Sequence, residues 1–248
     1  MKYLIIGASS GLGRELANIF AQKRNDLIIV SRDKRDLDAL KSDLEIKYNI
    51  NVETIELDFS SLEEINEKLL NKNQILQNLE GALFPVGMMF DDDNLSMNIE
   101  KTQKLVFCNF ISIAYTINIL SKYLRKKNNS SLIGFGSVSG FLGRKTNVSY
   151  AGAKRGLESF FESLAFDKSF KSINIQFYTL GYLDTNLSFG KDLKLPKGSI
   201  NKLSKLVYNN KNHNFKKIYY PAYWYIIYLV LKVIPISILR KFAEVLNK

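Results

Sequence analysis

Cysteine and histidine are almost absent from this sequence. The only cysteine is Cys108 and the only histidine is His213. One cysteine excludes an internal disulfide and suits a reducing compartment, so we expect a cytoplasmic protein. One histidine excludes a multi-histidine metal site, and we predict no metal centre. His213 would be the only base for a serine–histidine hydrolase, but a lone histidine in a loop is more often a surface residue.

A long hydrophobic segment near the N-terminus is also missing. No apolar stretch follows a basic start, so we expect no signal peptide. No internal repeat is visible, and no linker suggests a second domain. The 248 residues, of which 46% are hydrophobic and 24% charged, therefore suit one large α/β domain with enough apolar material for a core.

Acidic residues are outnumbered by basic ones. The chain has 35 Lys and Arg against 24 Asp and Glu, which gives a net charge of +11. Such a charge suits nucleic acid, an anionic membrane or acidic substrates as partners. The basic residues are scattered through the predicted helices, however, and no nucleic-acid-binding motif accompanies them. We therefore expect no nucleic-acid partner, and AT-rich coding would give the same lysine-rich composition.

Short strand patterns alternate with helical patterns along most of the chain. The predicted strands are Lys2–Ile6, Asp26–Val30, Asn51–Leu57, Gly81–Phe84 and Ser131–Gly136. Helical segments separate them, and the longest runs from about Met97 to Lys126. This alternation predicts a doubly wound parallel sheet, whose ligands bind outside the carboxyl ends of the strands.

The first strand leads directly into a glycine-rich turn and then a helix over Arg14–Phe20. Gly7 permits the tight turn, Gly11 lets the backbone approach a phosphate, and Gly13 lets the helix pack closely on the strand. The free N–H groups at the helix N-terminus would bind a pyrophosphate. The cofactor-binding residues predicted in this turn are Gly7, Ser9, Ser10, Gly11, Leu12 and Gly13.

The end of the second strand bears on the choice of cofactor. An acidic residue there would bind the ribose of NAD, whereas an arginine accommodates the 2′-phosphate of NADP. Ser31 and Arg32 occupy this position, and both suit a phosphate. We therefore predict NADP(H), with NAD as the less favoured cofactor. Asp33 is a candidate cap for the helix that runs to about Tyr48.

Two further positions offer polar groups to a cofactor or a site. Asp58-Phe59 ends the third strand, and the carboxylate could accept from the adenine amino group, cap the helix Ser61–Leu70, or do both. Asn109 lies in the middle of the longest predicted helix among apolar neighbours. A buried asparagine is costly unless it is hydrogen-bonded, so it either bonds inside the fold or serves a site.

The segment from Ser137 to Lys154 carries the candidate chemistry. Tyr150 and Lys154 are four residues apart in a predicted helix over Tyr150–Phe170, so they share one face. A free tyrosine has a pKa of roughly 10, and a nearby positive charge lowers it. Such a phenol can exchange a proton with a carbonyl or alcohol oxygen. Ser137, at a strand end, could hold the same oxygen.

Taken together, these residues resemble the classical short-chain dehydrogenases/reductases. The resemblance covers about Lys2 to Thr185. It rests on Gly7, Gly11, Gly13, Asp58, Asn109, Ser137, Tyr150 and Lys154, in the order and spacing of that family. It implies a Rossmann fold with a seven-stranded parallel sheet, with helices on both faces.

The resemblance also implies roles for the predicted catalytic residues. Tyr150 would be the acid/base, and Ser137 would orient the substrate oxygen. Lys154 would bind the nicotinamide ribose and lower the pKa of Tyr150. Asn109 would hold a water in a proton relay. Further cofactor contacts are expected at Gly87, Gly181, Leu183 and Thr185.

The chain departs from the family pattern at three places. Phe84-Pro85-Val86-Gly87 replaces the usual Asn-Asn-Ala-Gly, Leu180-Gly181 replaces Pro-Gly, and Ile6 replaces a threonine. None of these changes removes a proton-transfer group, so we expect an active enzyme.

The chain after Thr185 does not follow the family pattern. Residues 186–211 are polar and are predicted to form a mobile substrate loop, and Phe215–Tyr220 a last strand that completes a domain over residues 1–220. Residues 221–248 form a hydrophobic extension, broken by Pro221 and Pro235 into two short helices. Its longest uncharged apolar run ends at Lys232, well short of the roughly 20 residues that a spanning helix needs.

Three locations are possible for this hydrophobic extension. It could pack over the substrate cleft, bury against a second subunit in a homodimer or homotetramer, or lie in a membrane interface. Tyr223, Trp224, Tyr225 and Tyr228 suit an interface, where aromatic rings with polar tips collect. Lys232 and the net charge would favour anionic lipid.

The favoured function is NADP(H)-dependent interconversion of a small-molecule carbonyl and a secondary alcohol. A cofactor-binding sensor without turnover is an alternative, although a sensor needs the glycine turn but not the set of Asn109, Ser137, Tyr150 and Lys154. A sugar epimerase or dehydratase of the extended relatives is another, but the region after Tyr150 leaves little room for a larger substrate domain.

Overall fold

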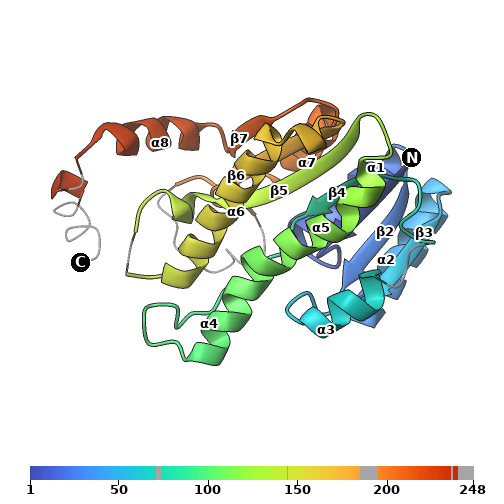
Figure 1. Ribbon diagram of the computed structural model, residues 1–248, viewed down its shortest axis with the longest axis horizontal. Helices are drawn as coiled ribbons and strands as arrows, with labels where there is room; N and C mark the ends of the chain where they lie inside the picture. The colour runs from blue at the N-terminus through green and yellow to red at the C-terminus, as the bar shows by residue number, and fades with distance from the viewer. Residues whose placement is uncertain (71–73, 144, 185–194, 236, 240–248) are drawn as a thin grey trace.

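Seven parallel strands form the centre of the molecule, in the order β3-β2-β1-β4-β5-β6-β7 (Figure 1). The strands are β1 (Lys2–Ile6), β2 (Asp26–Ser31), β3 (Val52–Glu56), β4 (Leu79–Phe84), β5 (Ser130–Ser137), β6 (Ile173–Leu180) and β7 (Lys216–Tyr220). The computed structural model describes all residues except 71–73, 144, 185–194, 236 and 240–248. The predicted parallel sheet and its seven strands are confirmed.

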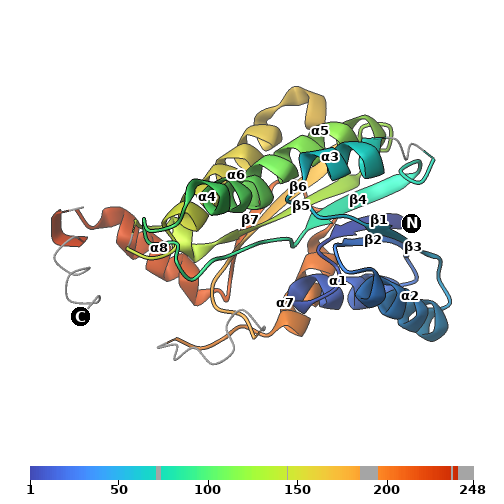
Figure 2. The same ribbon diagram turned by 90° about the horizontal axis from the view of Figure 1, so that it is seen from below.

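Helices cover both faces of this sheet (Figure 2). On one face lie α3 (Leu62–Ile65), α4 (Ile99–Val106), α5 (Ser112–Leu124) and α6 (Val148–Phe166). On the other lie α1 (Gly11–Gln22), α2 (Lys34–Tyr48) and α7 (Ile200–Asn210). A last helix, α8 (Tyr223–Val233), follows β7 and projects from one end of the molecule. The prediction of a doubly wound fold is therefore confirmed.

The strands read as apolar runs because they are buried on both faces. Leu4 and Ile6 of β1 pack into a core with residues of α5 and α6. Tyr3 and Ile5, which point to the opposite face, pack into a second core with residues of α1, α2 and α7. Buried parallel strands lack the polar alternation of half-exposed ones, which explains the sequence pattern.

The strand order reverses between β1 and β4, and ligands of doubly wound sheets bind at this switch point. The loops that follow these two strands touch there. A Cβ atom added to Gly7, whose φ is +91°, would lie 3.1 Å from the Cα atom of Val86. Glycine is therefore required at Gly7 by both conformation and space.

The long predicted helix is interrupted by a π-helical segment, Phe107–Ile111, between α4 and α5. Asn109 lies in this segment, and its Nδ2 donates to the carbonyl of Leu105, four residues earlier. A side chain that competes for this carbonyl favours the wider π turn. Among described residues, only the run Ile99–Leu124 is long and apolar enough to cross a membrane, and half of its 18-residue apolar window is buried inside the protein.

Two predicted element boundaries are wrong. The segment predicted as a loop over 186–211 contains α7, where the N-cap is Ser199 and Leu203 and Val207 are buried on one face. The helical spacing of these residues was missed among polar neighbours. The helix predicted to reach Phe170 ends at Phe166, and a separate 3-10 turn follows, with Asp167 capping it at Ser169.

Replacement of Gly13 by alanine tests the close packing of α1 on β1. A Cβ atom at Gly13 would overlap the carbonyl oxygen of Gly7 and lie 2.7 Å from its carbonyl carbon. Gly13→Ala should therefore lower the free energy of unfolding by about 1–3 kcal/mol or more. Gly152→Ala is the matched control, because a Cβ at Gly152 of α6 meets nothing within 4 Å.

Alanine is also the better helix former, so Gly152→Ala should stabilise the protein by up to about 1 kcal/mol. Urea denaturation of both variants provides the measurement. Equal effects of the two substitutions would contradict the assigned packing of Gly13.

Candidate active site

The N-terminus of α1 is shaped to bind an anion. Ser10 is its N-cap residue, but the Ser10 side chain does not cap the helix, and no acidic residue lies in the first turn. Gly11 has a φ of +50°, which turns the chain into the helix. The first N–H groups of a helix have no partner within the helix, and its dipole favours a negative charge there. This geometry fits the pyrophosphate of a dinucleotide.

The predicted adenosine end lies beside this turn. Ser31 is buried at the end of β2, and its hydroxyl donates to Ser9 Oγ at 2.8 Å, which ties the strand to the glycine loop. Arg32 follows and is exposed. The side chain of Phe59 is buried in the core. Asp33 caps α2, as predicted, by accepting from the N–H groups of Arg35 and Asp36.

Asp58 follows β3, but it is not the cap of the next helix. Ser61 caps α3, because its hydroxyl accepts from the N–H of Glu64. The Asp58 Oδ1 instead accepts from Ser60 N at 2.9 Å and Ser60 Oγ at 2.6 Å. Burial raises the pKa of Asp58, but the hydrogen bonds from Ser60 and the charges of Lys104 and Arg32 outweigh it and lower the pKa overall.

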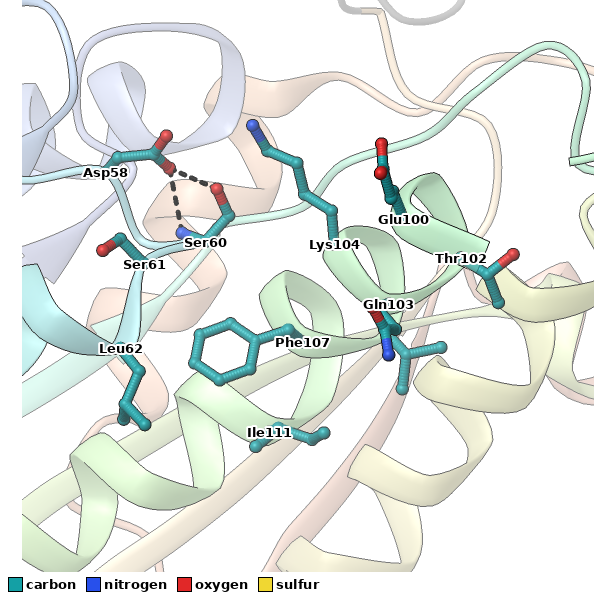
Figure 3. Close-up of a pocket in the computed structure, with 11 residues that line it drawn as sticks. Asp58, Ser60, Ser61, Leu62, Glu100, Thr102, Gln103, Lys104, Phe107 and Ile111 are labelled. Atoms are coloured by element: carbon teal, nitrogen blue, oxygen red, sulfur yellow. Dashed lines mark hydrogen bonds between the residues drawn. The ribbon is translucent and has the colours of Figure 1, made fainter. Parts of the chain in front are cut away.

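A hollow of about 840 Å³ opens beside Asp58 (Figure 3). Asp58, Ser60 and Lys104 form its polar side, while Phe107 and Ile111 form an apolar side. Ser137, Tyr150 and Lys154 are not among the described residues that line it. Lys104 was missed in the sequence, because only the packing of α4 near the end of β3 brings its charge to Asp58.

Tyr150 and Lys154 lie one turn apart on α6, as predicted. The Lys154 Nζ is 5.9 Å from the centroid of the Tyr150 ring. The same nitrogen donates to the carbonyl of Val86 at 3.3 Å and to that of Phe135 at 3.2 Å. Its ammonium group therefore joins α6 to the loop after β4 and to β5. Burial lowers the pKa of Lys154 from 10.5 to about 8.

Ser137 is the last residue of β5, at the edge where ligands bind in this fold. Its Oγ accepts from Ser139 N at 3.2 Å and from Ser139 Oγ at 2.7 Å. The hydroxyl hydrogen of Ser137 is not used in either bond. A serine placed in this way can donate to a substrate oxygen.

Gly87, Asn109 and Lys154 converge behind this edge. A Cβ atom at Gly87 would lie 3.2 Å from Asn109 Oδ1 and 3.6 Å from Lys154 Nζ. Asn109 is fully buried, accepts from Met88 N at 3.2 Å, and donates to the carbonyls of Met88 and Leu105. Of the two predicted alternatives, bonding inside the fold is thus observed; the role in a water relay stays a prediction.

The predicted nicotinamide contacts lie near the end of β6. A Cβ atom at Gly181 would overlap the indole of Trp224, so this glycine makes room for α8. Leu183 is buried and forms a parallel bridge with Gly198. Thr185 lies outside the described residues.

Asp93 is a site residue that sequence reasoning missed. It is 2% exposed and accepts from the backbone N–H groups of Ser149 and Tyr150, both at 2.9 Å. Asn147, the N-cap residue of α6, makes no side-chain cap. Asp93 therefore caps α6 from a distant loop and holds the backbone of Tyr150. It lies in an Asp-Asp-Asp run that is typical of a solvated turn, so nothing in the local sequence indicates that Asp93 is buried or caps a helix.

The fold and these residues define a nucleotide-binding α/β enzyme, and the comparisons with known proteins identify its family. The family model for short chain dehydrogenases matches residues 2–194. The chain therefore belongs to the short-chain dehydrogenase family and is an oxidoreductase. Members of this family bind NAD(P) and act on small molecules.

Curated relatives are similar in sequence along most of the chain. A 3-oxoacyl-[acyl-carrier-protein] reductase of Buchnera aphidicola is 26% identical over 185 residues, which covers 75% of this chain and 74% of the relative. A very-long-chain 3-oxoacyl-CoA reductase of Podospora anserina is 26% identical over 227 residues, which covers 88% of this chain and 66% of the relative.

Solved structures show the same fold. A short-chain dehydrogenase from Sphingobium yanoikuyae in complex with NADPH aligns with a TM-score of 0.77 and 22% identity over 87% of each chain. A short chain dehydrogenase from Burkholderia cenocepacia in complex with NADP aligns with a TM-score of 0.79 and 14% identity, over 89% of this chain and 96% of that chain.

Removal of the Asp93 carboxylate tests its hold on α6. Asp93→Ala would leave two part-buried N–H groups at a helix N-terminus without their charged acceptor. Each hydrogen bond to a charged group contributes about 1.5–3 kcal/mol, so we expect a loss of that order or more in the free energy of unfolding.

The neighbouring Asp92→Ala is the matched control. Its exposed ion pair with Lys101 has a separation of 2.7 Å, and such surface pairs contribute only about 0–1 kcal/mol. Urea denaturation and near-UV circular dichroism measure both variants. If Asp93→Ala were as stable as Asp92→Ala, the long-range cap would be refuted.

Proposed function

We propose that this chain catalyses the NADP(H)-dependent interconversion of a carbonyl and a secondary alcohol. The observation that carries the proposal is the buried Lys154 ammonium one turn below Tyr150, at the edge of the sheet that also carries Ser137. The names of two relatives, both 3-oxoacyl reductases, support a carbonyl substrate.

Proton transfer is assigned to Tyr150. In the direction of reduction, the phenol gives its proton to the substrate oxygen as that oxygen becomes an alcohol; in oxidation the phenolate takes the proton back. When bound, the nicotinamide supplies or accepts the hydride at the substrate carbon. Asp93 holds the backbone from which the Tyr150 side chain projects.

Lys154 and Ser137 assist this transfer in different ways. The positive charge of Lys154 favours the phenolate of Tyr150, because opposite charges attract strongly where water is excluded. With a pKa of about 8, Lys154 is largely protonated at neutral pH. Ser137 can donate its hydroxyl hydrogen to the substrate oxygen and so fix its distance from Tyr150.

A preference for NADP(H) is proposed from the charges at the adenosine end. Arg32 is exposed directly after β2, and no carboxylate lies at the strand end itself. Lys104 adds a second positive charge near Asp58. Arginine binds phosphate through a planar, charge-assisted fork. Two structural neighbours that hold NADPH or NADP are consistent with this preference.

Substitution of Tyr150 by phenylalanine tests the chemistry. The ring remains and only the proton carrier is lost, so turnover should fall by about 10²- to 10⁴-fold while NADPH binding is nearly unchanged. Lys154→Ala should weaken both turnover and binding. A screen of ketones with NADPH, followed by kcat and cofactor titration, measures these effects.

Tyr115→Phe is the control, because Tyr115 lies on α5 and its hydroxyl bonds to Asn66 instead. Near-native kcat in Tyr150→Phe would refute the proton-transfer role. Tight NADPH binding without turnover of any ketone would instead favour a cofactor sensor.

Substitution of Arg32 by alanine tests the cofactor preference. A charge-assisted contact to the 2′-phosphate contributes about 1.5–3 kcal/mol, so NADPH affinity should fall roughly ten- to hundred-fold. NADH affinity should hardly change. Arg35→Ala is the matched control, since Arg35 is an exposed arginine in the first turn of α2 whose ion-pair partner is Asp33. Tighter binding of NADH than of NADPH by the unaltered protein would overturn the preference.

A further inference from the structure

Helix α8 presents an unusually apolar surface to solvent. One stripe of its surface consists of Tyr225, Ile226, Leu229, Val230 and Val233, all of which are exposed. We call these five residues the apolar stripe. They recur at intervals of four residues, so they lie along one side of the helix. Ile226 is 64% exposed and Val233 is 83% exposed.

The opposite side of α8 anchors the helix to the domain. Trp224 is buried against Gly181, and its ring lies 5.8 Å from that of Tyr182 and 6.3 Å from that of Phe141. Tyr228 packs against Phe141 at 5.1 Å. The helix is thus held in a defined orientation with the apolar stripe facing outward, and the stripe is not an end that frays.

The position of α8 relates it to the candidate active site. Ser137 of β5 is level with Leu180 of β6, which is level with Tyr220 at the end of β7. Because these strands are parallel, α8 begins at the same edge of the sheet as Ser137. Figures 1 and 2 show the helix projecting beyond this edge, away from both layers of helices.

The stretch of sequence that contains α8 carries charge of one sign. Residues 193–243 contain no Asp or Glu. The basic residues in this range are Lys194, Lys197, Lys202, Lys205, Lys211, Lys216, Lys217, Lys232, Arg240 and Lys241. Nearly all of the net charge of +11 therefore comes from this part of the chain. Lys217 is paired with Glu158 and Glu162. Lys197 and Lys202 line a hollow next to the start of α8.

We propose that α8 docks the protein on an anionic lipid bilayer, with the apolar stripe inserted at the interface. An apolar helix face that carries Lys232 and aromatic rings, in a basic stretch of the sequence, has the chemistry of an interfacial anchor. The 11 residues of α8 are roughly 16 Å long, about half of the 30 Å needed to cross a bilayer. The helix therefore lies in the plane of the interface.

Charge also decides against a second copy of the chain as the occupant. A two-fold contact through α8 would bring Lys232 and the rest of this basic stretch close to their own copies, where like charges repel. An anionic bilayer complements both the charge and the apolar stripe. Docking in this orientation would bring the edge with Ser137 to the membrane, so that an apolar carbonyl compound could enter from the bilayer. This last consequence rests on the proposed function; docking itself does not.

The test is cosedimentation of the full-length protein with vesicles. Vesicles of phosphatidylglycerol and phosphatidylcholine should bind it at low salt, and high salt or pure phosphatidylcholine should release it. The double variant Ile226→Asp/Val230→Asp should lower the bound fraction about tenfold or more. Ile46→Asp is the matched control, because Ile46 is an apolar residue of α2 that is 84% exposed; this variant should bind like the unaltered protein.

Several outcomes would overturn the proposal. The protein could stay in the supernatant with anionic vesicles at low salt, or the double variant could bind as well as Ile46→Asp does. A double variant that changed from dimer to monomer in light scattering, with unaltered vesicle binding, would assign the stripe to a subunit interface. Binding of duplex DNA in place of vesicles would assign the charge to nucleic acid.

Catalysis is measured separately, so that the two proposals can fail independently. The double variant should keep the kcat/KM of the unaltered protein for a water-soluble ketone. It should lose about tenfold for a ketone supplied in vesicles. Vesicle binding without turnover of either ketone would support docking and refute the proposed function.

Discussion

The Lys154 ammonium group is the constraint around which the candidate site is arranged. Water is excluded from it, and burial lowers its pKa to about 8. Its hydrogen bonds reach the carbonyls of Val86 and Phe135, so one side chain joins α6, the loop after β4 and β5. Gly87 of this loop lies so close to Asn109 that an added Cβ atom would be 3.2 Å from Asn109 Oδ1. The protein thus accepts the cost of a buried charge to keep that charge beside Tyr150.

Buried polar groups elsewhere in the site serve a similar purpose. Asp93 and Asn109 both connect the loop after β4 to a helix, the first at the start of α6 and the second in the π-helical segment. The side chain of each forms its hydrogen bonds with backbone groups, which are rigid partners. Residues held in this way keep their geometry when ligands come and go, as preorganised sites require.

The C-terminal part of the chain, with α8 and its basic residues, is the feature that distinguishes this protein from the general pattern of its family. Trp224 takes the space that Gly181 leaves open at the end of β6, and through it α8 is attached to the edge of the sheet that carries Ser137. The positive charge of the molecule is concentrated in the same region of the sequence. The edge of the sheet with Ser137, which belongs to the family pattern, and α8, which is particular to this chain, therefore lie side by side at the carboxyl ends of the strands.

Local patterns in the sequence were enough to predict the parallel sheet, the glycine turn before α1, and Tyr150 and Lys154 on one face of α6. Each of these depends on spacing within a single element or its neighbours, where strand and helix periodicity are direct consequences of backbone geometry. The family followed from the same residues. The roles of the individual site residues and the predicted oligomer stay predictions.

Other features were decided only by the tertiary structure. The cap that Asp93 provides to α6 spans 57 residues, and Lys104 reaches Asp58 only through the packing of two distant elements. Helix α7 was hidden by polar residues around Leu203 and Val207, and the indole of Trp224 explains Gly181. No local spacing encodes such contacts, because they arise when segments far apart in the chain compete for the same space and the same hydrogen bonds.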